Sequence, residues 1–155
     1  MMIDPFNPDP EQISIVDIAH ALSHVCRFNG HTHRFYSVAE HCILVASLLD
    51  DPKDKLAAML HDASEAYLTD LTRPVKYRME KYLDVEFHLM MVISRLFGFQ
   101  YPLSVAVKDA DDKALAHEWA NIVIGDRLPT MSPTEARREF MHQMDILLNR
   151  IITEK

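Results

Sequence analysis

The stretch His61-Asp62-Ala63-Ser64-Glu65-Ala66-Tyr67-Leu68-Thr69-Asp70 brings metal-binding side chains next to the apolar run 56–60. On a helix, Glu65 lies one turn beyond His61 and Asp62, so an imidazole and two carboxylates share a narrow sector of one face. The apolar turn that precedes them directs this face inward, where an unpaired charge is costly. A bound cation is the simplest partner that makes such an arrangement favourable.

The composition favours helices. The chain has 155 residues, of which 48% are apolar and only three are glycine. This length suits one domain with a substantial core and is too short for two ordinary domains. Abundant Ala, Leu, Met and Glu with so little Gly predict an all-α fold, in a single domain over residues 1–155.

The net charge and the two cysteines limit the partners and the cell compartment that we expect for this protein. The net charge of −7, from 16 basic and 23 acidic side chains, argues against a broad surface for a nucleic acid polymer but allows a small basic pocket for one nucleotide. Cys26 and Cys42 have no metal-type spacing, and we expect reduced core residues, as in a cytoplasmic protein. The sequence has no leader pattern and no apolar run of membrane-spanning length, so we expect a soluble protein without a membrane partner.

The beginning of the chain predicts an arm and then a helix. Prolines interrupt residues 1–13, which predicts an extended N-terminal arm. Ser14 as a cap and an apolar helical repeat predict a helix over 14–26. His20 and His24 stand at i and i+4 on it, a spacing that binds metals but belongs more often to packed or hydrogen-bonded histidines.

Two capping signals open the helices that carry the central residues. Ser37 and Glu40 form a capping box. The helix that they open has His41 among apolar neighbours, either as a satisfied core histidine or as a metal ligand. An Asp-Pro pair then opens a helix over 52–67, with the His-Asp pair at its middle.

Three further helices complete the pattern. After a short break, Pro74 opens a helix that ends at Gly98, and Pro102 opens the next one. A capping box at Ser132 opens a C-terminal helix over 132–153.

The last two helices leave choices open. Asp111 lies among acidic neighbours, which indicates either a solvated face or a metal ligand, and Trp119 is expected as a core aromatic residue. The C-terminal helix has more apolar residues than one face needs, which predicts a homo-oligomer. These residues are Phe140, Met141, Met144, Leu147, Leu148 and Ile151.

Several segments together resemble the HD-domain metal-dependent phosphohydrolases, whose signature is H…HD…D. The segments are Asp17-Ile18-Ala19-His20-Ala21-Leu22-Ser23, Phe35-Tyr36-Ser37-Val38-Ala39-Glu40-His41, and His61-Asp62-Ala63-Ser64-Glu65-Ala66-Tyr67 with Asp70 and Pro74-Val75-Lys76. The resemblance covers residues 14–126 and implies a single HD-domain bundle of about six helices. Within the superfamily the chain looks most like the compact 5′-deoxynucleotidase branch, and especially the short phage enzymes that destroy dATP in viruses with 2-aminoadenine in their DNA.

This resemblance assigns the metal ligands. It makes His41, His61, Asp62 and Asp111 the ligands of a divalent ion, and so favours the ligand role for His41 and Asp111. Two imidazoles and two carboxylates suit Mn²⁺, Co²⁺ or Mg²⁺ with open positions, and they also accept Zn²⁺.

The resemblance also implies roles around the ion. Glu65 and Asp70 match an acidic pair that orients the attacking water and transfers protons. The phosphate-binding residues of the family match Arg27, Lys76 and Lys108. Phe28 stands where bacterial nucleotidases of this branch have Trp, and it is a candidate contact to the base or sugar.

The function implied is hydrolysis of the α-phosphate ester of a deoxynucleotide, with dATP giving deoxyadenosine and triphosphate. A 5′-nucleotidase acting on deoxynucleoside monophosphates would use the same residues and admit fewer phosphates. A nucleotide-binding or assembly protein with a structural metal is the alternative from another class, and for it Glu65 would be dispensable. The expected location is the cytoplasm, that of the host if a phage encodes the chain.

Overall fold

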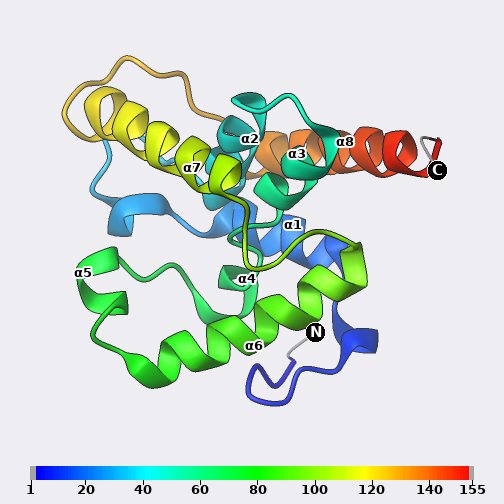
Figure 1. The fold of residues 1–155 in the computed structure, drawn as a ribbon. Coiled ribbons are helices and arrows are strands. Elements are labelled where there is room, and N and C mark those ends of the chain that lie inside the picture. The colour runs from blue at the N-terminus through cyan, green and yellow to red at the C-terminus, as the bar shows by residue number, and fades with distance from the viewer. Residues whose placement is uncertain (1–2, 154–155) are drawn as a thin grey trace.

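The fold is all-α (Figure 1). The computed structural model describes residues 3–153, and six helices in this range have eight residues or more. They are α1 (Ile15–His24), α2 (Val38–Ser47), α3 (Pro52–Met59), α6 (Glu80–Phe97), α7 (Val105–Glu118) and α8 (Pro133–Thr153). Shorter helical turns join them: η1 (Pro10–Gln12), η2 (Arg27–Gly30), α4 (Glu65–Leu68), α5 (Arg73–Lys76) and η3 (Trp119–Val123). The predicted all-α class with about six helices is confirmed.

One cluster of buried apolar side chains joins the long helices. Helix α8 packs against α1, α2 and α3, while α7 packs against α2 and α3. Figure 1 shows α6 and α7 at opposite edges of the molecule, with α5 beyond one end of α6. The cluster draws on all six long helices, through residues that include Ile18, Val45, Leu56, Leu89, Val107 and Phe140.

The prediction of one helix over 52–67 is wrong. Helix α3 ends at Met59, and the chain turns through residues 60–64 before α4 begins. The reason lies in the His61 side chain, whose Nδ1 is 2.7 Å from the carbonyl oxygen of Ala58. A continuing α-helix would pair this carbonyl with the N–H of residue 62, so the imidazole takes the place of a helical hydrogen bond. His61 and Asp62 therefore lie in a tight turn.

Other predicted boundaries shift for local reasons. Helix α1 ends at His24, before the expected residue 26, because extended backbone follows it and Cys26 forms an isolated antiparallel bridge with Ser37. The helix expected from Pro74 to Phe97 is divided into α5 and α6 by a turn at residues 77–79.

The ends of two further segments differ as well. Helix α7 begins after Ser104, whose hydroxyl accepts the N–H of Val107, so Pro102 precedes the helix. The N-terminal arm includes the helical turn η1, and its residues 1–2 lie outside the described range. The C-terminal helix has its predicted extent, with the capping contacts of Ser132 and Glu135 in place. Over residues 3–153, every helix is too short or too polar to cross a lipid bilayer.

Candidate metal centre and adjoining cleft

Three metal-binding side chains from distant parts of the chain converge. His41 is on α2, one turn after the Ser37 cap, and His61 and Asp62 come from the turn after α3. Each offers a ligand atom, and these atoms all lie within 4.8 Å of one another. Both histidines are buried and Asp62 is partly buried. This His-His-Asp group could hold a metal ion.

The hydrogen bonds of the two rings direct their free nitrogens to one point. His41 Nδ1 is 2.7 Å from Glu118 Oε1, and His61 Nδ1 is 2.7 Å from Ala58 O. An acceptor at Nδ1 places the proton there and leaves Nε2 with a lone pair. The two Nε2 atoms are only 3.2 Å apart. Two imidazole lone pairs so close together, with the Asp62 carboxylate beside them, would repel one another unless a cation lay between them. The chemistry of these three side chains therefore fits a metal ion.

Asp111 of α7 borders the His-His-Asp group. Its Oδ1 lies 3.1 Å from His41 Nε2 and 3.8 Å from His61 Nε2. Its Oδ2 accepts a hydrogen bond from Arg73 at 3.0 Å. One carboxylate oxygen is therefore held by an arginine while the other faces the imidazoles, as a fourth ligand would.

The charges at this site favour ionised carboxylates. Burial by itself raises the pKa of Asp62 and Asp111, but the neighbouring imidazoles outweigh it and lower both pKa values. For His41, burial lowers the pKa, but the adjacent carboxylates of Asp111 and Glu118 outweigh it and raise the pKa. Negative charge therefore collects around the Nε2 atoms, where a cation would bind.

A buried carboxylate supports His41 from behind. The side chain of Glu118 has no exposed surface, and it accepts hydrogen bonds from Tyr36 at 3.1 Å and from Arg27 at 3.0 Å besides its contact with His41. Arg27 in turn has its second terminal nitrogen 3.7 Å from Asp62 Oδ2. The network connects α2, η2 and α7 at the metal centre.

Glu65 and Asp70, which the resemblance implies as an acidic pair, both line the cleft beside the His-His-Asp group. Glu65 is 4% exposed, and its Oε2 has no hydrogen-bond partner among the described residues. Burial, followed by repulsion from Asp62 and Asp70, raises the pKa of Glu65 well above its usual value. Burial also raises the pKa of Asp70. Both shifts favour the protonated form, and a carboxyl group beside a reacting group can transfer protons.

The three basic residues expected at a phosphate site line the same cleft. Arg27 is 9% exposed, and its Nε has no hydrogen-bond partner within residues 3–153. Lys76 forms an ion pair with Glu86 at 2.6 Å, and Lys108 is exposed on α7. The cleft has a volume of about 1040 Å³. This is large for a small-molecule pocket.

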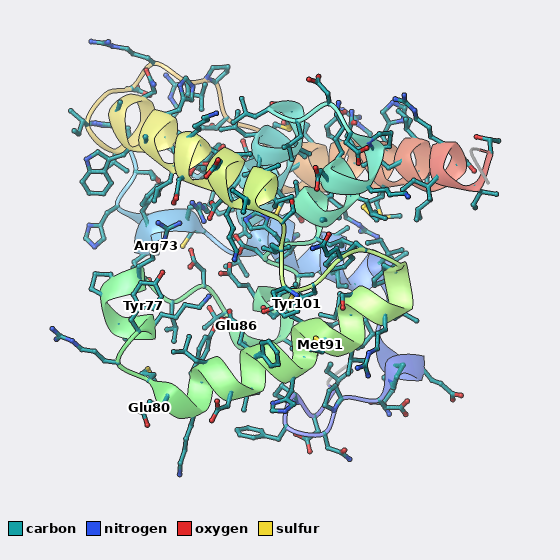
Figure 2. The ribbon with its side chains drawn as sticks, viewed as in Figure 1. Arg73, Tyr77, Glu80, Glu86, Met91 and Tyr101 are labelled. Atoms are coloured by element: carbon teal, nitrogen blue, oxygen red, sulfur yellow. The ribbon has the colours of Figure 1, made fainter. Side chains whose placement is uncertain are left out.

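The cleft also has apolar and aromatic walls. Phe28, Leu115, Ala116 and Trp119 line it together with residues of α5 and α6. Figure 2 shows Glu86 and Tyr101, two further lining residues, between α6 and α7. The expectation that Trp119 is a core aromatic residue is wrong, because it is 50% exposed and η3 carries it to the cleft.

The chain is similar to two uncharacterized bacterial proteins. The chain is 39% identical over 124 residues to the uncharacterized protein YfdR of Escherichia coli (strain K12). The matched region covers 79% of this chain and 67% of that protein. It is 35% identical over 151 residues to the uncharacterized protein RCAP_rcc00048 of Rhodobacter capsulatus, covering 89% of this chain and 74% of that protein. The chain belongs to the YfdR family. No protein-family model matches it.

Membership of the YfdR family assigns no activity, because both relatives are named as uncharacterized. The site itself shows which residues the sequence analysis missed: Tyr36, Arg73, Glu86 and Glu118. Glu118 left a signal, since it follows Asp111 by seven residues and so shares its face of α7. Arg73 and Glu86 left none, because their partners become neighbours only when α5, α6 and α7 assemble. The pair His20 and His24 forms only a local contact, with His24 Nδ1 2.7 Å from the His20 carbonyl.

Proposed function

We propose that this protein is a metal-dependent phosphohydrolase that cleaves the α-phosphate ester of a deoxynucleotide, with dATP yielding deoxyadenosine and triphosphate. The observation that carries the proposal is the convergence of His41 Nε2, His61 Nε2 and Asp62 beside a cleft lined by basic side chains. A divalent ion such as Mn²⁺, Co²⁺, Mg²⁺ or Zn²⁺, held by these residues and Asp111, would lower the pKa of water and neutralise phosphoryl charge.

The basic residues suit the phosphates. Arg27 Nε is a buried donor that lacks an acceptor among the described residues, and a phosphate oxygen would supply one. A guanidinium makes forked contacts with phosphate oxygens, whereas the ammonium groups of Lys76 and Lys108 act as point charges. A triphosphate chain has several anionic groups, so cations spread around a wide cleft favour it over a monophosphate.

Glu65 suits proton transfer. The reaction forms a bond between the water oxygen and the α-phosphorus and breaks the bond between that phosphorus and the 5′-oxygen. The water loses a proton, and the departing 5′-oxygen gains one. Glu65 Oε2 is unpartnered within the described residues, and burial shifts the pKa of this carboxyl upward, toward the protonated form that can give a proton to the departing oxygen. Asp70, at the same cleft, is the second candidate for this transfer.

The test is product analysis by phosphorus NMR after incubation of the Mn²⁺- or Co²⁺-loaded protein with dATP and, separately, with dAMP. We expect deoxyadenosine and intact triphosphate from dATP. Cleavage of dAMP alone would replace this proposal by a 5′-nucleotidase. Absence of cleavage of either nucleotide would reject both and favour the binding protein with a structural metal.

A variant separates catalysis from metal binding. Glu65→Gln keeps the shape of the side chain and removes its ability to accept a proton. We expect metal binding to persist in this variant while dATP turnover falls by at least 100-fold, in line with the usual contribution of a general acid or base. The control is Glu11→Gln in η1, outside the cleft, which should keep full turnover. Undiminished turnover in Glu65→Gln would contradict the assigned role.

A further inference from the structure

The single tryptophan of the chain lies at the cleft. Trp119 is 50% exposed and lines the cleft. The residue before it, Glu118, is fully buried and bonded to His41, Arg27 and Tyr36. The backbone at Trp119 is therefore anchored at the metal centre, while the indole faces the open space of the cleft. Trp119 also begins the π-helical turn η3, and π-helical turns are frequent at functional sites.

A second aromatic ring is held against it in a conformation that costs energy. Phe28 has φ 54° and Asn29 has φ 53°, values that residues other than glycine seldom adopt. The ring of Phe28 meets the indole edge to face, with centroids 5.9 Å apart and an angle of 63° between the planes. Residues held in such conformations by their surroundings cluster at active sites and ligand clamps.

Arg27 connects the two aromatic rings with the metal centre. Its guanidinium carbon lies 5.2 Å from the centroid of the Phe28 ring, and its terminal nitrogen lies 3.7 Å from Asp62 Oδ2. Cationic and aromatic groups thus follow one another outward from Asp62 through Arg27 and Phe28 to Trp119. Leu115 and Ala116, from the last turn of α7, add apolar surface beside the indole. A ligand with a phosphate at Arg27 and a flat apolar ring beyond it matches this order.

We propose that Trp119, supported by Phe28, is the stacking wall for the base of the bound nucleotide. This inference rests on the proposed function for the phosphate end of the ligand and goes beyond it by assigning the base. Stacking on an aromatic face tolerates any base, and it grows with ring area. The site therefore prefers purine over pyrimidine deoxynucleosides, and it binds sugar phosphates without a base more weakly.

Intrinsic fluorescence tests the proposal directly, because all tryptophan emission of this protein comes from Trp119. We would titrate the metal-loaded protein with deoxyadenosine, with thymidine and with 2-deoxyribose 5-phosphate. We expect saturable quenching by deoxyadenosine at lower concentration than by thymidine, and no quenching by the sugar phosphate. Equal quenching by the sugar phosphate, or no saturable quenching by deoxyadenosine, would overturn the proposal.

A pair of variants separates stacking from a general effect on the fold. By calorimetry, Trp119→Leu should bind deoxyadenosine about tenfold more weakly or worse, the loss expected when an aromatic stacking partner is removed. Tripolyphosphate, which has no base, should bind Trp119→Leu as it binds the unaltered protein. Phe6→Leu, an exposed aromatic residue outside the cleft, is the matched control and should bind both ligands normally.

The two proposals fail in different ways. Quenching by deoxyadenosine without hydrolysis of dATP would keep the base site and reject the phosphohydrolase. Hydrolysis of dATP with unchanged deoxyadenosine affinity in Trp119→Leu would keep the phosphohydrolase and reject the stacking role. Loss of tripolyphosphate binding in Trp119→Leu would also reject it, because the substitution would then act on the phosphate end of the cleft.

Discussion

The orientation of both imidazoles at the metal centre is set by their Nδ1 atoms. His61 uses a backbone carbonyl, whereas His41 uses the carboxylate of Glu118. A carboxylate behind a metal-binding histidine fixes the ring and raises its basicity. Glu118 is also fully buried with Arg27 at 3.0 Å, so its charge has a partner inside the protein. Glu118 thus both orients His41 and neutralises the charge of Arg27 inside the protein.

Glu118→Gln should weaken metal binding. The amide still fills the space but loses the negative charge that supports His41, and such partners typically contribute 10- to 100-fold to metal affinity. We expect a loss in this range for Mn²⁺ or Co²⁺, measured by isothermal titration calorimetry, with circular dichroism as the check on folding. Tyr36→Phe removes only the hydrogen bond that an uncharged hydroxyl donates to the same carboxylate, and it should change the metal affinity less. Equal affinities in Glu118→Gln and the unaltered protein would contradict the role of Glu118.

Helix α2 presents His41 because its first turn is fixed on both sides. Ser37 and Glu40 form the predicted capping box, and both are buried. Glu40 Oε1 also accepts the N–H of Met131 at 2.6 Å, so the cap joins α2 to the segment before α8. The same motif recurs at Ser132 and Glu135, where it is exposed to solvent. The two caps have similar sequences and different surroundings.

This contrast predicts different stability effects for the same substitution. Ser37→Ala should lower the free energy of unfolding by about 1–2 kcal/mol, because it removes a cap and leaves a buried donor of α2 without an acceptor. Ser132→Ala should cost about 0.5–1 kcal/mol, since water can replace the lost hydroxyl at an exposed helix end. Urea unfolding of both variants measures the difference. A larger loss in Ser132→Ala would show that burial does not strengthen the cap at Ser37.

Basic and acidic side chains both line the cleft of this protein, whose net charge is −7. Its lining residues come from η2, α4, α5, α6 and α7 and from the turns beside them. The long C-terminal helix covers the other helices: three of its six noted apolar residues are buried in the core, and the other three pack against it. These six residues therefore do not provide an interface for the predicted homo-oligomer, which would have to form through another part of the surface. The homo-oligomer stays a prediction, as do the cytoplasmic location and the absence of nucleic acid and membrane partners.

Metal binding should stabilise the whole fold. A ligand that binds only the folded state at 100 times its dissociation constant adds about 2.7 kcal/mol, which for a chain of this length raises the melting temperature by about 5–10 °C. We expect such a rise for Mn²⁺, Co²⁺ or Zn²⁺ in a thermal melt, and its reversal by a chelator. Asp62→Asn removes one ligand charge and should abolish most of the rise. An undiminished rise in that variant would indicate that the metal binds elsewhere.

Much of the fold follows from local signals in the sequence. The chain has few glycines, and its helix signals act within a turn or two of their own position. These signals are the capping residues Ser14, Ser37 and Ser132 and the stop at Gly98, so the sequence alone predicts helices there. The end of α3 at Met59 was missed because the His61 side chain competes with the backbone for the Ala58 carbonyl. Helical periodicity contains no information about such a competition.

The sequence by itself determined the all-α class and supplied the residues of the candidate metal centre, because composition, caps and the His-Asp pair are local properties. Only the tertiary structure decided how these residues meet. The Nε2 atoms of His41 and His61 lie 3.2 Å apart, and Glu118 is buried behind His41. Arg73 pairs with Asp111, and Trp119 is exposed at the cleft. Each of these contacts joins segments at least 20 residues apart or depends on which side of a helix the core covers. That is fixed by the packing of all the helices together.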